Sequence, residues 1–331
     1  MKAIVFDQFG DPADVLRVRD VPVPEPERGQ VRVRMLASPI NPSDLLSVRG
    51  QYGRRPALPA TPGFEGVGVV DAAGPGLLGR WRLGRRVAVL NSQGGNWQEQ
   101  VIVSARQVVP IAGDVSDEQA ATFFVNPATA FIMTRLVLKV ASDAWVLQTA
   151  AGSALGRMVI RLGKHFGFRT LNVVRRPEQA EELLQAGGDA VICTKTESIE
   201  KRVEELTGGA GVPFALDAVG GDTGSAIVRC LGNRGRLLIY GTLAEEPLSV
   251  HPRILIVGQK RIEGFWLSEW ARQQRILKML RLFRQIQGLL AKGILATEIG
   301  ATFALDDIQA AVRQASLPGH RGKVLLRIAS A

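Results

Sequence analysis

The feature that most constrains the fold is a regular alternation of short apolar strands and helices between residues 145 and 240. Trp145-Val146-Leu147-Gln148 predicts a strand, which a run of small residues joins to a helical pattern over 157–165. The alternation continues with strands over 170–174, 190–193, 214–217 and 236–240 and helices over 177–186, 198–206 and 223–230. This order predicts a parallel sheet with right-handed crossovers, whose ligands bind beyond the carboxyl ends of its strands.

The first third of the chain has a different character. Eleven of the 17 prolines fall within residues 1–110. Proline at this density prevents long helices, because each ring removes an amide donor and clashes with the preceding turn. Between the prolines lie alternating segments such as Val31-Arg32-Val33-Arg34-Met35, and similar pieces occur at 66–70, 86–90 and 100–104. We therefore expect an irregular β-rich domain.

The end of the chain returns to short strand-like pieces. A helical stretch over 269–292 is followed by apolar pieces at 301–304 and 323–328. These pieces resemble the first domain, so we expect that domain to be discontinuous and completed by the C-terminus. The predicted division is a first β-rich segment over 1–120, a nucleotide-binding domain over 121–268, and a linking helix with the return segment over 269–331.

Composition excludes several classes of protein. No apolar run approaches the ~18 residues of a membrane helix, and the N-terminus reads as a strand rather than a signal peptide. Two cysteines and three histidines, all far apart, cannot form a disulfide framework or the short-spaced pairs of a structural zinc site. Cys193 and Cys230 are expected to be buried packing residues. We expect a cytoplasmic protein with no metal and no membrane partner.

A small-residue turn follows the first strand of the alternating region. In Ala151-Gly152-Ser153-Ala154-Leu155-Gly156 only the third glycine of a G-x-G-x-x-G pattern is present. Small side chains still allow the backbone to approach a pyrophosphate at the helix N-terminus. The segment predicts a dinucleotide site, with a plain strand–helix turn as the alternative.

The next strand indicates which dinucleotide is bound. A site for NAD places an acidic residue ~20 residues further on, against the ribose 2′-hydroxyl. Here Arg175 and Arg176 follow Asn172-Val173-Val174, and the next acid is Glu178. Guanidinium groups suit a 2′-phosphate, so NADPH is the predicted cofactor. The alternative is two solvated arginines in an arginine-rich chain.

Four further segments carry a family resemblance over nearly the whole chain. They are Ile40-Asn41-Pro42-Ser43-Asp44, Gly50-Gln51-Tyr52-Gly53, Val125-Asn126-Pro127-Ala128-Thr129-Ala130 and Gly264-Phe265-Trp266-Leu267-Ser268-Glu269-Trp270. With them the chain resembles the zinc-free medium-chain dehydrogenase/reductase superfamily, most of all the mitochondrial-type 2-enoyl thioester reductases, and also the quinone oxidoreductases. The resemblance implies an α/β fold: a GroES-like β-rich catalytic domain, a Rossmann domain with a doubly wound parallel sheet, and a cleft that holds nicotinamide and substrate.

The resemblance also bears on the metal. Zinc alcohol dehydrogenases take a cysteine ligand in the region of Asn41 to Asp44 and a histidine ligand from a Gly-His-Glu motif. This chain has Gly63-Phe64-Glu65 instead, and phenylalanine cannot ligate zinc. Without a Lewis acid, a conjugated double bond is a better hydride acceptor than a simple carbonyl, because the substrate's own carbonyl takes up the charge.

Site residues follow from the resemblance, residue by residue. Tyr52 matches the family's proton donor, a role that suits a neutral phenol. Asn126 matches a residue that contacts the cofactor and helps to orient the tyrosine. The family's second basic position falls on Pro177, with Arg176 in place of an acid. The implied cofactor contacts are Asn126, Gly152, Ser153, Ala154, Leu155, Arg175, Arg176, Tyr240, Gly241, Thr242, Leu243, Phe265, Trp266, Leu267 and Lys323. His165, His251 and His320 are poor candidates for the acid.

The predicted activity is NADPH-dependent reduction of the α,β double bond of a 2-enoyl thioester carried by CoA or acyl carrier protein. The alternatives are an NADPH:quinone oxidoreductase and a non-catalytic NADPH-binding sensor. A homodimer through residues 261–267 is expected. A basic stripe (Arg272, Arg275, Lys278, Arg281 and Arg284) suggests attraction to CoA phosphates or to an acidic carrier, or else a solvated helix face. Nucleic-acid binding is not expected, because no aromatic residues interleave this stripe.

Overall fold

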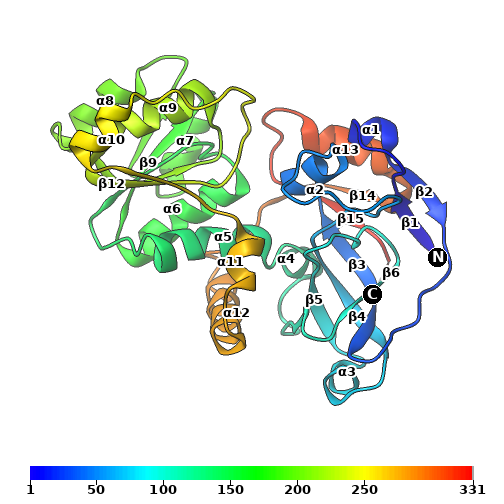
Figure 1. The fold of residues 1–331 in the computed structure, drawn as a ribbon. Helices are drawn as coiled ribbons and strands as arrows, with labels where there is room; N and C mark the ends of the chain where they lie inside the picture. Colours follow the sequence, from blue (N-terminus) through cyan, green and yellow to red (C-terminus); the bar gives the residue numbers. More distant parts are fainter. Residues whose placement is uncertain (330–331) are drawn as a thin grey trace. The chain divides into compact units, whose positions relative to one another are not determined.

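The computed structural model describes residues 1–329, which divide into two compact units. Of the described residues, the first unit contains 1–125 and 297–329, and the second contains 126–296. These bounds differ from the division drawn from the sequence, because the helices that follow residue 268 belong to the second unit. Figure 1 traces the chain through both units.

The first unit is built on a seven-stranded sheet in the order β14-β15-β3-β4-β5-β7, with β6 also paired to β3. Its strands are β3 (Gln30–Pro39), β4 (Glu65–Ala73), β5 (Arg86–Leu90), β6 (Gln100–Ser104), β7 (Val108–Pro110), β14 (Ile299–Ala304) and β15 (Lys323–Arg327). The pairing of β15 with β3 joins the two ends of the chain in one sheet, as the sequence predicts. A separate hairpin is formed by β1 (Lys2–Val5) and β2 (Arg17–Asp20).

Short helices complete this unit. They are α1 (Pro12–Val15), α2 (Pro42–Val48), α3 (Leu77–Arg82), α4 (Asp117–Ala121), α13 (Ile308–Ser316) and the 3-10 turn Leu305–Asp307. One apolar core lies between the hairpin, α2 and α13, and a second fills the sheet around Val33, Val70 and Val87. The prolines between the strands account for the shortness of these helices.

The second unit is a six-stranded parallel sheet in the order β10-β9-β8-β11-β12-β13. Its strands are β8 (Trp145–Gln148), β9 (Arg169–Val174), β10 (Ala190–Cys193), β11 (Val212–Asp217), β12 (Leu231–Ile239) and β13 (Arg261–Gly264). The order reverses between β8 and β11, which is the doubly wound arrangement of dinucleotide-binding domains. The predicted parallel sheet is confirmed.

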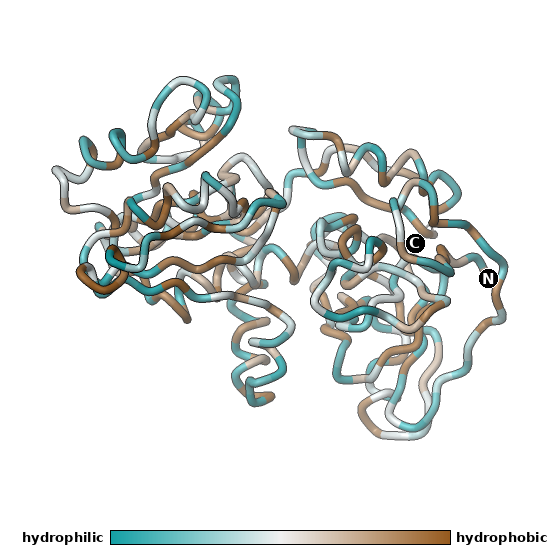
Figure 2. Tube along the Cα trace, turned by 45° about the horizontal axis from the view of Figure 1, so that its top comes forward, coloured by the Kyte–Doolittle hydropathy of each residue, from teal (hydrophilic) through white to brown (hydrophobic). Residues whose placement is uncertain are grey.

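Helices cover both faces of this sheet, as Figure 1 shows. The helices of this unit are α5 (Val125–Phe131), which continues as a π-helix over Ile132–Val137, α6 (Ala154–Phe166), α7 (Glu178–Gln185), α8 (Ile199–Thr207), α9 (Gly221–Cys230), α10 (Pro252–Gly258), α11 (Leu267–Arg272) and α12 (Ile276–Ala291). Ile160 of α6 and Leu183 of α7 pack in one apolar cluster, and Val203 of α8 and Ile227 of α9 in another. In Figure 2 hydrophobic segments follow the strands of this sheet. Cys193 and Cys230 are both buried, as predicted.

The prediction of one long helix over 269–292 is wrong. The chain forms α11 and α12 with a break at residues 273–275. At the break, the side-chain amide of Gln274 donates to the carbonyl of Trp270 at 2.9 Å, and Arg275 adopts an extended conformation at the start of α12. The Gln274 side chain thus occupies the Trp270 carbonyl, which the backbone amide of Gln274 would bond in a continuous α-helix.

Candidate functional site

Most of the predicted site residues lie at one edge of the parallel sheet. The turn 149–153 follows β8, Arg175 follows β9, Tyr240 follows β12 and Phe265 follows β13. Because these strands are parallel and adjacent, their carboxyl ends meet at the same edge. The second unit therefore gathers these residues without help from the rest of the chain.

The turn after β8 presents the N-terminus of α6. Ser153 caps this 13-residue helix, its side-chain oxygen accepting the amide of Gly156 at 3.1 Å. The amides of Ala154 and Leu155 stand in the first turn, where an α-helix supplies no acceptors. Gly156 is needed for packing, because a Cβ there would lie 2.4 Å from the carbonyl oxygen of Ala151. The helix start is thus fixed against the turn and offers amides to an anion.

Arg175 stands directly beyond β9, which is paired with β8. Its side chain is exposed and forms no ion pair with any carboxylate in residues 1–329, while Arg176 is half-buried. The backbone carbonyl of Arg175 accepts a hydrogen bond from the thiol of Cys193 at 3.6 Å. An arginine at the edge next to the α6 turn is suitably charged for a 2′-phosphate.

Two residues that do not stand out in the sequence shape the centre of this edge. The Thr149 hydroxyl donates to Asp217 at 2.6 Å and accepts the amide of Ala218 at 2.9 Å. The Asp217 carboxylate also accepts the amides of Val219 and Gly220, each at 3.0 Å. These bonds join β8 to β11 where the strand order reverses. The one feature of the sequence that could have pointed to this pair is Asp217, an acid at the end of the apolar strand Phe214-Ala215-Leu216.

The Tyr240 hydroxyl is buried and has no hydrogen-bond partner among residues 1–329. Burial, with a smaller contribution from the Asp217 charge, raises the pKa of this phenol, so the hydroxyl keeps its proton. An unsatisfied buried hydroxyl is unfavourable by ~1–3 kcal/mol, which a ligand acceptor would relieve. Together with the α6 amides and Arg175, this orphaned donor fits a bound dinucleotide.

The remaining predicted residues of this unit lie on the segments that follow β12 and β13, except Asn126. The Leu243 amide bonds to the carbonyl of Ala218, and the Phe265 amide bonds to the carbonyl of Ile239. Trp266 begins α11. Gly241 and Thr242 follow Tyr240 directly, and Asn126 is the second residue of α5. That these residues contact the cofactor stays a prediction.

In the first unit, a buried polar cluster consists of Asn41, Asp44, Glu65 and Lys323. The Lys323 ammonium donates to Asn41 Oδ1 at 2.7 Å, and Asn41 Nδ2 donates to Glu65 at 3.1 Å. The Asn41 amide donates to Asp44 at 2.7 Å. Asn41 therefore bridges the cation to both carboxyl groups. The cofactor contact predicted for Lys323 is untested, but in this unit its ammonium is committed to the cluster.

Burial governs the protonation of this cluster. It raises the pKa of Asp44 to about 7, although the amides of Asn41 and Phe64 and the charge of Lys323 oppose the shift. Burial also raises the pKa of Glu65 and lowers that of Lys323. The charged forms are disfavoured because water is excluded, and the hydrogen bonds compensate only in part.

The buried cluster fixes the surroundings of Tyr52. Asp44 accepts the amide of Phe64 at 3.0 Å, and the ring of Phe64 lies 5.1 Å from the half-buried ring of Tyr52. The Tyr52 amide donates to the carbonyl of Leu46 in α2. The tyrosine is thus held by a backbone bond to α2 and a ring contact to Phe64.

Glu65 reaches the segment that precedes Asn126. Its carboxylate accepts the amides of Phe124 at 3.0 Å and Val125 at 2.8 Å. These are the last amides before Asn126 in the sequence. The cluster therefore fixes two segments of the first unit, at Phe64 beside the Tyr52 loop and at residues 124–125.

The donors of this region do not fit a zinc ion. Within residues 1–329, no group of three or more histidine, cysteine or acidic side chains is arranged to hold a metal. By the resemblance, Phe64 stands in place of a histidine ligand of the zinc relatives and residues 41–44 lie in the region of a cysteine ligand. The carboxylates of Asp44 and Glu65 accept backbone amides.

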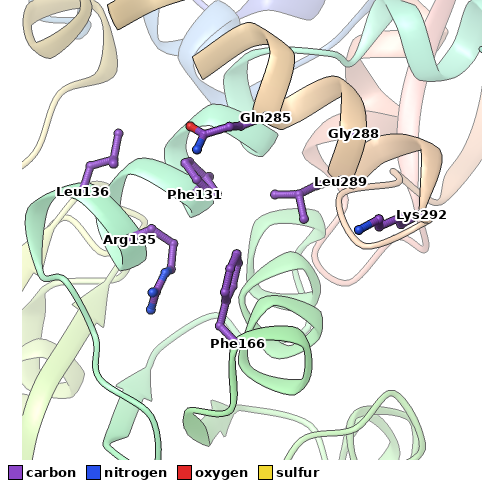
Figure 3. Close-up of a pocket in the computed structure, with 8 residues that line it drawn as sticks. All are labelled: Phe131, Arg135, Leu136, Phe166, Gln285, Gly288, Leu289 and Lys292. Carbon is purple, nitrogen blue, oxygen red and sulfur yellow. The ribbon is translucent and has the colours of Figure 1, made fainter. Parts of the chain in front are cut away.

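A pocket of about 430 Å³ lies elsewhere in the second unit (Figure 3). It is lined by Phe131, Arg135, Leu136, Phe166, Gln285, Gly288, Leu289 and Lys292. The Arg135 guanidinium lies 4.4 Å from the centroid of the Phe166 ring. Phe166 ends α6, whereas the turn 149–153 precedes it, so this pocket is a helix length from the strand edge. None of the predicted site residues lines it.

None of the helices within residues 1–329 combines the length and apolar character needed to span a bilayer.

Comparison with known proteins matches both units to families. Residues 27–113 match the alcohol dehydrogenase GroES-like domain, and residues 154–285 match the zinc-binding dehydrogenase family. The human mitochondrial enoyl-[acyl-carrier-protein] reductase is 32% identical over 98% of this chain and 88% of its own length.

Solved structures agree on the fold. A putative NADPH:quinone reductase from Bacillus thuringiensis is 34% identical, with a TM-score of 0.94 over 99% of both chains. A quinone oxidoreductase from Escherichia coli, solved with NADPH, is 25% identical, with a TM-score of 0.91 over 99% of this chain and all of its own. The predicted α/β fold, a GroES-like domain with a Rossmann domain, is confirmed. The chain belongs to the medium-chain dehydrogenase/reductase superfamily of oxidoreductases.

Proposed function

We propose that the protein is an NADPH-dependent, zinc-independent reductase of 2-enoyl thioesters. The observation that carries this proposal is the setting of Tyr52: its phenol belongs to a loop fixed against Phe64, where a metal ligand of the zinc relatives is replaced by an apolar ring. The name of the human relative supports the substrate class.

The cofactor is NADPH, which the Escherichia coli neighbour contains. The residues that would hold it are the α6 turn, Arg175, Arg176 and the Tyr240 segment. When bound, it supplies a hydride to the β-carbon of the enoyl thioester. Arg175 gives the site its positive charge, and Ser153 fixes the helix start by its capping bond.

Tyr52 then supplies the proton. Addition of hydride at the β-carbon leaves an enolate on the substrate, whose negative charge is shared with the thioester oxygen. The neutral phenol of Tyr52 donates its proton to the α-carbon, which completes the reduction and leaves a phenolate to be reprotonated from water. We propose that Asn126, fixed through the Glu65 bonds to its neighbours, orients the tyrosine.

The first experiment compares substrates and removes the phenol. Oxidation of NADPH should be followed with crotonyl-CoA, a longer enoyl-CoA and a simple quinone. Tyr52→Phe keeps the ring contact with Phe64 but removes the proton donor, so it should lower kcat on the enoyl-CoA by ~10²–10⁴-fold. NADPH affinity, measured by fluorescence titration, should not change.

The outcomes are distinct. Unchanged turnover in Tyr52→Phe would contradict the acid role. Turnover of the quinone but not the enoyl-CoA would favour the second candidate, a quinone oxidoreductase, which the Bacillus thuringiensis neighbour supports by its name and 34% identity. No turnover of any substrate, with intact NADPH binding, would favour the sensor.

We also propose a homodimer that forms through residues 261–267. β13 (Arg261–Gly264) is the outermost strand of the parallel sheet, with one edge unpaired within the described chain. On the neighbouring α10, Ile256 and Val257 are 74% and 76% exposed. An unpaired edge beside exposed aliphatic residues suits strand addition.

The proposed setting is the cytoplasm, in fatty acid metabolism, where two buried free thiols would stay reduced.

A further inference from the structure

The first unit carries an unusual surface on α3 and the turn after it. The segment 76–86 reads Gly-Leu-Leu-Gly-Arg-Trp-Arg-Leu-Gly-Arg-Arg and contains no acidic residue. We define the α3 patch as Leu77, Leu78, Trp81 and Leu83 together with Arg80, Arg82 and Arg85. In Figure 1 α3 forms a tip beyond the strands β4 and β5 of its unit.

The apolar side chains of α3 face away from the sheet. Gly79 is the buried residue of this helix, and a Cβ there would lie 3.4 Å from the Cβ of Ala73 and the carbonyl of Gln30. With glycine on the inner face, Leu77 is 87% exposed, Trp81 56% and Leu83 52%. A helix that rests on a sheet ordinarily buries its large apolar residues. Here they face outward, and an exposed apolar patch marks a contact surface.

The cations of the patch have no counter-ions within the described chain. The guanidinium carbons of Arg82 and Arg85 lie 4.6 and 4.4 Å from the centroid of the Trp81 ring. Among residues 1–329, Arg80, Arg82 and Arg85 form no ion pair, and the buried Nε of Arg82 has no hydrogen-bond partner. Burial and the nearby Arg85 charge lower the pKa of Arg82. Arg86, by contrast, pairs with Asp117. The α3 patch therefore holds like charges together around one indole ring.

We propose that the α3 patch is a membrane-contact surface, which inserts its leucines and Trp81 into the headgroup region of an anionic phospholipid bilayer. Exposed leucines with a tryptophan and flanking cations are the composition of segments that lie in the bilayer interface. Arginine binds phosphate oxygens in pairs, so lipid phosphates supply the missing anions. This inference reverses the expectation of no membrane partner, and it does not depend on the proposed reaction.

The first experiment measures co-sedimentation of the purified protein with vesicles of phosphatidylcholine alone or mixed with phosphatidylglycerol. Binding should require the anionic lipid. Leu77→Ser with Leu83→Ser should weaken it about tenfold or more, because two exposed side chains lose their apolar contact. Both side chains are exposed, so thermal unfolding should not change. If the double variant partitions onto anionic vesicles as strongly as the wild type, the proposal is overturned.

A charge-matched control separates this surface from the general attraction of a +10 protein to anionic lipid. Arg80→Gln, Arg82→Gln and Arg85→Gln remove three charges from the α3 patch. Arg275→Gln, Lys278→Gln and Arg281→Gln remove three charges from the N-cap and first turns of α12, whose surface is also basic and partly apolar. The α3 triple variant should lose about tenfold more affinity. Equal losses, or a larger loss from α12, would overturn the assignment.

A second measurement tests insertion directly. Phospholipids brominated near the headgroup quench tryptophans that enter the bilayer. Trp81→Phe should remove most of the quenching among the five tryptophans yet leave vesicle binding nearly intact. Quenching that persists in Trp81→Phe would mean that another segment inserts. Binding that shows no quenching and is displaced by polyglutamate would identify an acidic protein as the partner and overturn the membrane assignment.

Discussion

At the scale of single residues, the buried cluster in the first unit sets the local chemistry by its charge balance. Two carboxyl groups, Asp44 and Glu65, share one ammonium, Lys323, and all three are withdrawn from water. The ammonium reaches them only through Asn41. Burial therefore favours the protonated forms of both carboxyl groups, and it raises the pKa of Asp44 to about 7.

This protonation predicts a pH dependence of stability that Asp44→Asn should remove. The folded-state pKa of about 7 is above the ordinary value of 3.8, so the folded protein binds the extra proton in this range. The contribution of Asp44 to stability is complete below about pH 4 and is lost as pH rises towards 7. Urea unfolding between pH 4 and 8 should show that the stability advantage of the wild type over Asp44→Asn shrinks with rising pH.

The variant should also be less stable at low pH by ~1–3 kcal/mol, because an amide oxygen replaces only one of two acceptors. A difference that is constant across the range, or that grows with pH, would show that Asp44 is ionised throughout. Asp306→Asn, at an exposed surface pair, serves as the control and should change little.

Arg175 and Arg176 give the second prediction at this scale. Replacing both by alanine should raise the Kd for NADPH by ~10–100-fold, since charge-assisted bonds to a phosphate contribute ~1.5–3 kcal/mol, and should leave NADH binding almost unchanged. Isothermal titration with both nucleotides measures this. Arg281→Ala with Arg284→Ala, two exposed arginines on α12 of the second unit, is the matched control. Equal losses for the two nucleotides would refute the assignment.

Single residues differ in how far the sequence reveals them. The position of Arg175 is predictable because it depends on spacing from a nearby turn within one strand–helix–strand unit. The bond between Thr149 and Asp217 joins residues 68 positions apart. It depends on β8 and β11 being neighbours, which follows from the whole strand order and not from any local pattern.

At the scale of elements, hydrophobic alternation predicted the strands closely. β5, β6, β8 and β10 have the predicted bounds, because each is flanked by turn residues that stop the pattern. The prediction of one helix over 269–292 was wrong. Hydrophobic periodicity reflects only the spacing of apolar residues, and it does not show that the Gln274 side chain competes for the Trp270 carbonyl. The outward face of α3 was also not foreseen, because the sequence alone does not show which side of a short helix meets the sheet.

The start of α6 supplies a prediction at this scale. Gly156→Ala should destabilise the protein by ~1–3 kcal/mol and weaken NADPH binding, because the new methyl group would press on the Ala151 backbone. Gly288→Ala in α12 is the matched control: a Cβ at this position would meet no described atom within 4 Å, so alanine should be neutral or stabilise by up to ~1 kcal/mol. Thermal unfolding and nucleotide titration test both. A neutral Gly156→Ala would contradict the close packing.

At the scale of the whole molecule, the net charge of +10 is concentrated in exposed arginines and lysines. Arg272 lies on α11, Arg275 precedes α12, and Lys278, Arg281 and Arg284 lie on α12, all exposed. If this basic stripe steers an acidic carrier, kcat/KM for a carrier-linked enoyl substrate should fall about tenfold or more between low and physiological salt. The value for the CoA-linked substrate should fall less.

The variant Arg275→Gln, Lys278→Gln, Arg281→Gln should flatten the salt dependence for the carrier-linked substrate and leave the NADPH KM unchanged. Kinetics insensitive to salt would mean that the stripe is only a solvated surface. The comparison is made on initial rates, so it is separate from the vesicle experiments on the α3 patch.

The discontinuous first unit has a consequence for biosynthesis. The second unit is one continuous stretch of chain. In the first unit, β3 pairs with β15, which is synthesised almost 300 residues later. The nucleotide-binding unit can therefore assemble while the ribosome is still at work. The β-rich unit closes only after release of the final strand, so a truncated nascent product would retain a folded middle with its N-terminal strands exposed to chaperones and proteases.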